Sequence, residues 1–179
     1  RTDTTKRKDV LIKAMAKVVR EVPNALCMVT IDKGEEKLYP ELTGLIKELG
    51  IEKRVAVLGN VWEVLPQLYA ITDIYCSPSI MEGFGMAVQE SAATRVAVVG
   101  SNLIPFVVDY LLGKNVEEKV LPGAEKAVKI GEGGIVVEAD DVDGFAASLL
   151  YLLKNDSARD TMAAKALDIT VPYFTWEAM

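Results

Sequence analysis

The order of apolar segments along the chain constrains its fold more than any other feature of the sequence. Short, nearly continuous apolar runs alternate with longer segments in which apolar residues recur at helical spacing. Alternating strands and helices of these lengths are typical of an α/β protein whose mainly parallel sheet is covered by helices on both faces. With 179 residues, the chain has the size of one such domain.

Strands and helices can be placed by residue number from this pattern. The helix over 9–22 has Asp9 as its predicted N-cap, and the helix over 37–50 ends at Gly50. Residues 113–134 are rich in charge and glycine, and we expect a surface insertion there without predicting a regular element. Strands are predicted at 25–31, 54–59, 73–79, 96–100 and 135–139, and helices at 9–22, 37–50, 61–72, 84–94, 104–112, 141–155, 157–167 and, as the start of a last helix, 172–179.

Composition disfavours several classes of function. The formal net charge is −6, which argues against nucleic-acid binding because such binding needs many cations to neutralise phosphates. The two cysteines, Cys27 and Cys76, lie in apolar strand-like runs, which indicates buried thiols in a reducing cytoplasm rather than a disulfide. Because the chain has no histidine, we expect no metal site, and no apolar run approaches the roughly 20 residues of a transmembrane helix.

The loop SPSIMEGFG, between the strand at 73–79 and the helix at 84–94, is the main candidate site. Ligands of parallel α/β sheets bind at the carboxyl ends of strands, and a helix N-terminus offers unpaired amides to an anion. Gly83 and Gly85 allow unusual backbone dihedrals and a close approach of a ligand. The loop matches neither the Walker phosphate motif nor the full dinucleotide fingerprint, so a phosphate or diphosphate site of another kind is predicted.

Two carboxylates flank this loop, Glu82 within it and Glu90 in the following helix. Carboxylates accept hydrogen bonds from paired hydroxyls, so the two acids could hold sugar-like groups on either side of a phosphate. A nucleotide-sugar has this layout. The same pattern arises by chance if Glu90 is a solvated helix residue and Glu82 an acid favoured by the helix dipole.

The segment SIMEGFGMAVQES resembles the E-x7-E signature of retaining glycosyltransferases of the GT-B fold, in particular glycosyltransferase family 4. RTDTTKRKDVLIKAMAKV, RVAVLGNV with LPQLYAITDIYCSPS, and VPYFTWEAM are similar to further segments of that family in the same order, so the resemblance covers essentially the whole chain. It implies a Rossmann-like domain, the C-terminal, donor-binding half of a two-domain retaining hexosyltransferase. The rest of the enzyme would lie outside residues 1–179.

The resemblance also implies the ligands. The donor would be a UDP-, GDP- or ADP-sugar, with no cofactor and no metal. The acceptor, a sugar, glycolipid or small molecule, would be held by the other half, so the 179 residues alone would transfer nothing. The full-length protein would be cytoplasmic, or peripheral at the membrane.

Individual roles follow from the same resemblance. Arg1 and Lys6 would grip the donor diphosphate and stabilise the leaving group, although taken alone the KRK run is more typical of a solvated basic turn. Glu82 would contact hydroxyls of the transferred sugar, and Glu90 the ribose hydroxyls. The remaining implied donor contacts are Gly83, Phe84, Gly85 and Met86 at the diphosphate and sugar, and Asn60 and Val61 near the base.

The sequence departs from the family pattern in three places. Arg95 and Ala97 stand where the family often has Gly and Pro, so that turn is expected to differ. GSNLIPF lacks the frequent Gly-Gly, which puts donor contacts from that loop in doubt. The family's domain begins with a strand before Arg1 that would occupy the centre of the sheet, and residues 1–179 do not include it.

Two other functions remain open. Another GT-B-like sugar-nucleotide enzyme, an epimerase or a phosphorylase, would share the fold. An epimerase usually brings further acids and histidine from this half, and a phosphorylase needs a pyridoxal-phosphate lysine, for which the sequence shows no context. A non-catalytic nucleotide-binding α/β domain would bind a donor without transferring it.

Overall fold

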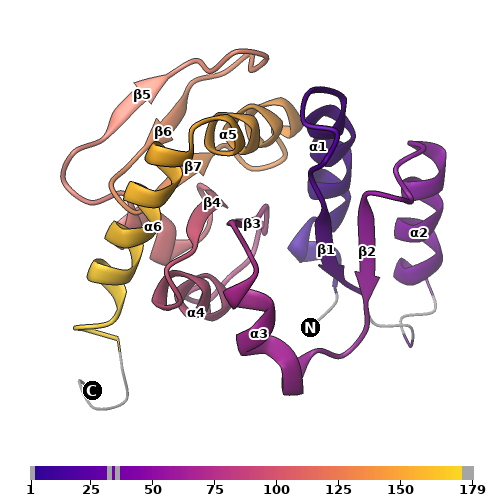
Figure 1. The fold of residues 1–179 in the computed structure, drawn as a ribbon, viewed down its shortest axis with the longest axis horizontal. Helices are drawn as coiled ribbons and strands as arrows, with labels where there is room; N and C mark the ends of the chain where they lie inside the picture. The colour runs from indigo at the N-terminus through magenta and orange to yellow at the C-terminus, as the bar shows by residue number, and fades with distance from the viewer. Residues whose placement is uncertain (1–2, 32–33, 35–36, 175–179) are drawn as a thin grey trace.

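A computed structural model describes residues 3–31, 34 and 37–174 of the chain. All five predicted strands are present, and the pairings among them are parallel (Figure 1). They are β1 (Cys27–Thr30), β2 (Val55–Leu58), β3 (Ile74–Ser77), β4 (Ala97–Ser101) and β7 (Gly134–Val137).

Helices cover both faces of the sheet, as predicted. Along β4, Ala97 and Val99 belong to one hydrophobic core with residues of α1, α2 and α5. Val98 points the other way, into a second core with residues of α4, η3 and α6. The helices are α1 (Lys8–Glu21), α2 (Leu38–Glu48), α3 (Leu65–Ala70), α4 (Met86–Ala93), α5 (Val142–Lys154) and α6 (Asp156–Thr170), with 3₁₀ turns η1 (Thr4–Lys6) and η2 (Trp62–Val64) and a π-helix η3 (Val107–Leu111).

The strands fall into two groups. β1 pairs with β2, and β3, β4 and β7 form a second sheet, while no pairing joins β1 to β3 within the described ranges. The two groups still share one core, because buried residues of α1 belong to the same cluster as Cys27 and Val29 of β1 and Val99 of β4. The two strand groups lie on either side of the position where the family resemblance places a further strand (Figure 1). Their shared core holds them together in one domain.

Residues 113–134, predicted only as a surface insertion, contain regular structure. β5 (Glu117–Lys119) and β6 (Val128–Ile130) form an antiparallel pair, and β6 pairs antiparallel with β7. Leu121 and Val128 are buried, at 2% and 1% exposure. The segment therefore extends the sheet and contributes to its core.

Several local predictions need correction. The first helix begins at Lys8, so Asp9 lies in its first turn and is not the N-cap. Residues 104–112 form a π-helix over Val107–Leu111 instead of an ordinary α-helix. Arg95 adopts a left-handed φ of 62°, so the turn before β4 has the backbone that a glycine would favour despite the substitution. Of the helix expected over 172–179, residues 175–179 lie outside the described residues.

Candidate functional site

The loop after β3 enters α4 through Gly85, which is the N-cap of that helix with φ 104°. A side chain there would clash, because an added Cβ would lie 2.7 Å from Cγ2 of Ile104. Gly83 differs from the prediction: its φ is not positive, and an added Cβ would meet nothing within 4 Å. Of the two loop glycines, only Gly85 must therefore be glycine for the fold itself. The unpaired amides of α4 begin directly after it, at Met86.

The N-terminal turn η1 lies against this loop. The amide of Ile80 donates a 2.8 Å hydrogen bond to the carbonyl oxygen of Thr5. The hydroxyl oxygen of Ser79 lies 3.2 Å from the same carbonyl oxygen. Ser101, at the end of β4, donates its hydroxyl to the carbonyl of Ser79 and holds the loop from the other side. These contacts fix the position of η1 at the carboxyl ends of β3 and β4.

The structure brings two predicted catalytic residues together. Lys6 at the end of η1 and Glu82 in the loop form an ion pair with 2.6 Å between Nζ and Oε1. Their side chains are 26% and 18% exposed, so the pair is partly shielded and still open to a ligand. A cation and a carboxylate thus meet in the loop that leads through Gly85 into the N-terminus of α4. Such a loop can bind an anion joined to a group rich in hydroxyls.

The other basic residues of the KRK run also have partners in the folded chain. Arg7, with φ 47°, pairs with Asp9 at 3.1 Å and with Asp140. The hydrogen bond to Asp9 is the main reason why the pKa of Arg7 is raised. Lys8 donates to the carbonyl of Thr30 at the end of β1, and burial lowers its pKa. The run is therefore integrated into the fold, unlike a solvated basic turn.

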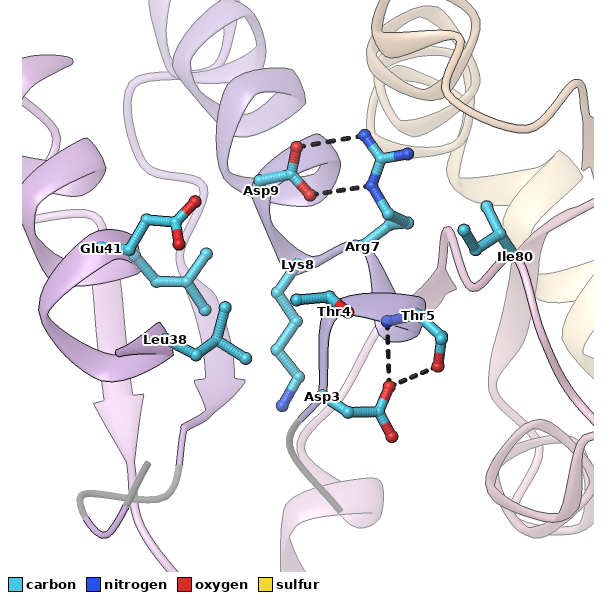
Figure 2. A pocket seen from close by; sticks show the side chains of 10 residues that line it. Asp3, Thr4, Thr5, Arg7, Lys8, Asp9, Leu38, Glu41 and Ile80 are labelled. Carbon is cyan, nitrogen blue, oxygen red and sulfur yellow. Dashed lines mark hydrogen bonds and ion pairs between the residues drawn. The ribbon is translucent and has the colours of Figure 1, made fainter. Parts of the chain in front are cut away.

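A pocket of 320 Å³ lies beside this run, between η1, the start of α1 and the start of α2 (Figure 2). Figure 2 shows Lys8 extending along the pocket from α1 and Glu41 reaching toward it from α2. Ile80 of the loop after β3 borders its far side. The pocket thus adjoins the loop that carries Glu82 without including that residue among those that line it.

The second predicted acid, Glu90, is exposed on α4 and has a partner that the sequence did not indicate. The hydroxyl of Tyr69, on α3, lies 3.3 Å from Oε2 of Glu90. Tyr69 is 8% exposed, and burial is the main reason why its pKa is raised. The pKa of Tyr75, on β3, is raised chiefly by burial and next by the charge of Glu82, with a smaller effect of Glu90. Both acids therefore act on the charge state of the partly buried Tyr75 phenol.

The remaining predicted residues are placed as follows. Asn60 and Val61 form the turn after β2, where Asn60 Oδ1 accepts a 3.1 Å hydrogen bond from the amide of Trp62. Trp62 is 77% exposed and was not singled out from the sequence, although an exposed tryptophan at a strand's carboxyl end is an unusual feature. The predicted contact Arg1 lies outside the described residues.

Within the described ranges, no group of three or more acidic or cysteine side chains could hold a metal ion. Cys27 and Cys76 are both free, Cys27 buried as predicted and Cys76 only partly buried. Burial raises the pKa of the Cys27 thiol to about 12. No helix in the part of the chain that the structure describes is long and apolar enough to span a bilayer.

Comparison with known proteins gives a family match and several curated relatives. The family described as Glycosyl transferases group 1 matches residues 1–115. Among curated relatives, N-acetyl-alpha-D-glucosaminyl L-malate synthase of Bacillus anthracis is 27% identical over 172 residues, which are 96% of this chain and 39% of the relative. The chain spans between 25% and 39% of the length of the curated relatives it matches.

Glycosyltransferases are among the solved structures that share the fold. A glycosyltransferase from Rickettsia africae superposes with a TM-score of 0.80 at 20% identity, over 99% of this chain and 42% of that protein. Anabaena HepE in complex with UDP and glucose gives a TM-score of 0.77 at 24% identity, over 97% of this chain and 42% of that one. These likenesses confirm the predicted α/β fold with its parallel sheet and helices.

Proposed function

Because the chain belongs to the family of group 1 glycosyl transferases, we propose that it is the donor-binding part of a retaining hexosyltransferase that uses a nucleotide-sugar. The observation that carries this proposal is the Lys6–Glu82 ion pair beside the N-terminus of α4. It supplies a cation for the diphosphate and a carboxylate for sugar hydroxyls, in the loop whose end offers the amides after Gly85 to the diphosphate.

The ion pair gives Lys6 and Glu82 coupled roles. Without ligand, each neutralises the other at 2.6 Å. When a diphosphate binds at the amides after Gly85, Lys6 would turn toward it, because two phosphate charges attract the ammonium more strongly than one carboxylate. Glu82 is then released to accept hydrogen bonds from the sugar. Donor binding would thereby move Lys6 from the carboxylate to the diphosphate, and the Glu82 carboxylate would be hydrogen-bonded by sugar hydroxyls instead of by the ammonium.

Ribose and base would extend along α4 toward the end of β2. Glu90 is exposed, and Tyr69 lies close enough to orient its carboxylate toward two adjacent ribose hydroxyls. Asn60 and Val61 would border the base. Lys6, with Arg1, would also stabilise the leaving nucleoside diphosphate, where negative charge grows in the transition state. The leaving phosphate would take the acceptor's proton on the same face, which gives retention without a protein base from these residues.

A solved structure with the same fold indicates which donor to test first. HepE was solved with UDP and glucose, so a UDP-sugar is the first donor to test, before GDP- and ADP-sugars. The acceptor, a sugar, glycolipid or small molecule, and its binding groups belong to polypeptide outside residues 1–179. We propose no role for nucleic acid.

The proposal can be tested by measuring nucleotide affinity of the intact protein. UDP-, GDP- and ADP-sugars are first compared by the rise in melting temperature that binding causes. Glu90→Gln should weaken binding of the active nucleoside diphosphate roughly 10- to 100-fold in calorimetry, since charge-assisted hydrogen bonds contribute about 1.5–3 kcal/mol. The control is Glu52→Gln, an exposed acid in the turn before β2, at the opposite end of the strands. Equal affinities of the two variants would remove Glu90 from the site.

A further inference from the structure

Four aromatic rings form a closed cluster behind the glycine loop. Phe84 of the loop, Phe106 and Tyr110 near η3, and Phe174 after α6 are all mutual neighbours, with ring centroids 4.9–5.8 Å apart in every pair. Pairs at these separations attract each other beyond the apolar area they bury. The ring of Phe84 therefore anchors the loop to the body of the domain.

The backbone on either side of Phe84 is tied to the same cluster. The carbonyl oxygen of Phe84 accepts a 3.0 Å hydrogen bond from the amide of Phe106. Gly85 packs closely on the residues before η3, since a Cβ added there would lie 2.7 Å from Cγ2 of Ile104 and 3.5 Å from Cβ of Phe106. The next helical turn is held as well, since the amide of Gln89 donates to the carbonyl of Gly85 at 2.9 Å.

The fourth ring comes from the far end of the described chain. After α6, the amide of Phe174 donates to the carbonyl of Thr170 at 3.0 Å, which folds residues 171–174 back as a turn. The side-chain amide of Gln89 then donates to the carbonyl of Phe174 at 3.0 Å. The turn therefore contacts the start of α4 through its backbone and the glycine loop through its ring, at the lower end of α6 beside α4 (Figure 1).

We propose that Phe174 is a positioning residue that sets the geometry of the diphosphate-binding amides through Phe84 and Gln89. This rests on the proposed function, because it names the element that keeps the donor loop in its binding conformation. Phe174 is half-buried and contacts all three other rings, so release of the turn would remove three of the ring contacts at once. The position of the turn over residues 171–174 thus controls how strongly the donor binds.

The decisive comparison uses the intact protein with Phe174→Ala, and Tyr173→Ala as the matched control. Tyr173 is the neighbouring aromatic residue and is 70% exposed. Phe174→Ala should weaken binding of UDP at least about tenfold, while binding of uridine, which lacks phosphates, changes less than about twofold. Tyr173→Ala should leave both affinities unchanged. General destabilisation would reduce both affinities together, so an equal loss for UDP and uridine overturns the proposal.

A second readout needs no ligand. Hydrogen exchange of the Phe106 amide, which is bonded to Phe84, should accelerate at least about tenfold in Phe174→Ala while amides of β4 keep their rates. Unchanged exchange at Phe106 overturns the proposal. If Phe174→Ala does not fold, Phe174→Leu replaces it, and the same difference between Phe106 and β4 is required. If the wild-type protein binds no nucleoside diphosphate, the proposed function fails, whereas the exchange rates still decide whether Phe174 holds the loop.

Discussion

Replacing Gly85 by alanine should destabilise the domain, whereas the same change at Gly83 should not. The two glycines stand in one loop, two residues apart, and the sequence alone predicts the same backbone freedom for both. In the structure Gly85 has φ 104° and Ile104 Cγ2 lies 2.7 Å from the position of a new Cβ. Gly83 has neither constraint.

The magnitude follows from these two terms. A non-glycine residue in a sparsely populated backbone region costs about 1–3 kcal/mol, and overpacking typically adds about 1–3 kcal/mol. Gly85→Ala should therefore lower the free energy of unfolding by roughly 2–6 kcal/mol. For a domain of this size, about 2–4 °C is lost per kcal/mol, so the melting temperature should fall by roughly 4–24 °C. Gly83→Ala should change stability by less than about 1 kcal/mol.

Both variants can be measured by thermal and urea unfolding followed by circular dichroism. A double-mutant cycle with Ile104→Ala separates the two terms, because removing Cγ2 relieves the clash and leaves the backbone strain. The double variant should be less destabilised than the sum of the single variants. If Gly83→Ala proves as harmful as Gly85→Ala, or if the cycle shows no coupling, the described geometry of the loop is wrong.

Further predictions concern the hairpin and a buried thiol. Leu121→Ala should lower the free energy of unfolding by about 2–4 kcal/mol in urea titrations, because Leu121 is 2% exposed; a loss near zero would mean that 113–134 is a loosely attached insertion after all. The pKa of Cys27 is raised to about 12 by burial, so its neutral form stabilises the folded state below the thiol's unfolded pKa, and this contribution is lost as pH rises from about 9 toward 12. The stability advantage of wild type over Cys27→Ala should accordingly shrink between pH 8 and pH 11, and a constant difference would contradict the burial of this thiol.

The sequence predicted the parallel core of the fold because each of its strands is an apolar run with clear boundaries. It did not reveal β5, whose residues Glu117 to Lys119 are all charged and exposed, so the strand carries no alternating pattern. Pairing with β6 specifies this strand, and that pairing depends on contacts distant in sequence. The π-helix over Val107–Leu111 is likewise set by packing, because its residues also suit an ordinary helix.

The candidate site was predicted in its parts but not in its connections. The loop, Lys6 and Glu82 could be named, whereas their ion pair joins residues 76 positions apart and depends on where η1 packs. Tyr69 was missed because it lies inside an apolar helical run, where nothing indicates that its hydroxyl faces Glu90. The sequence also did not indicate that the ring of Phe84 packs into the aromatic cluster, while its backbone belongs to the predicted loop.

The central claim is that a nucleoside diphosphate binds at the start of α4 between Lys6 and Glu90. A crystal structure of the intact protein with UDP tests it most directly. The account predicts the diphosphate within hydrogen-bonding distance of the amides after Gly85 and of Lys6 Nζ, with the Lys6–Glu82 pair opened and the ribose hydroxyls on Glu90. A complex in which UDP lies elsewhere, or in which Lys6 stays paired with Glu82 beside the bound diphosphate, would contradict it.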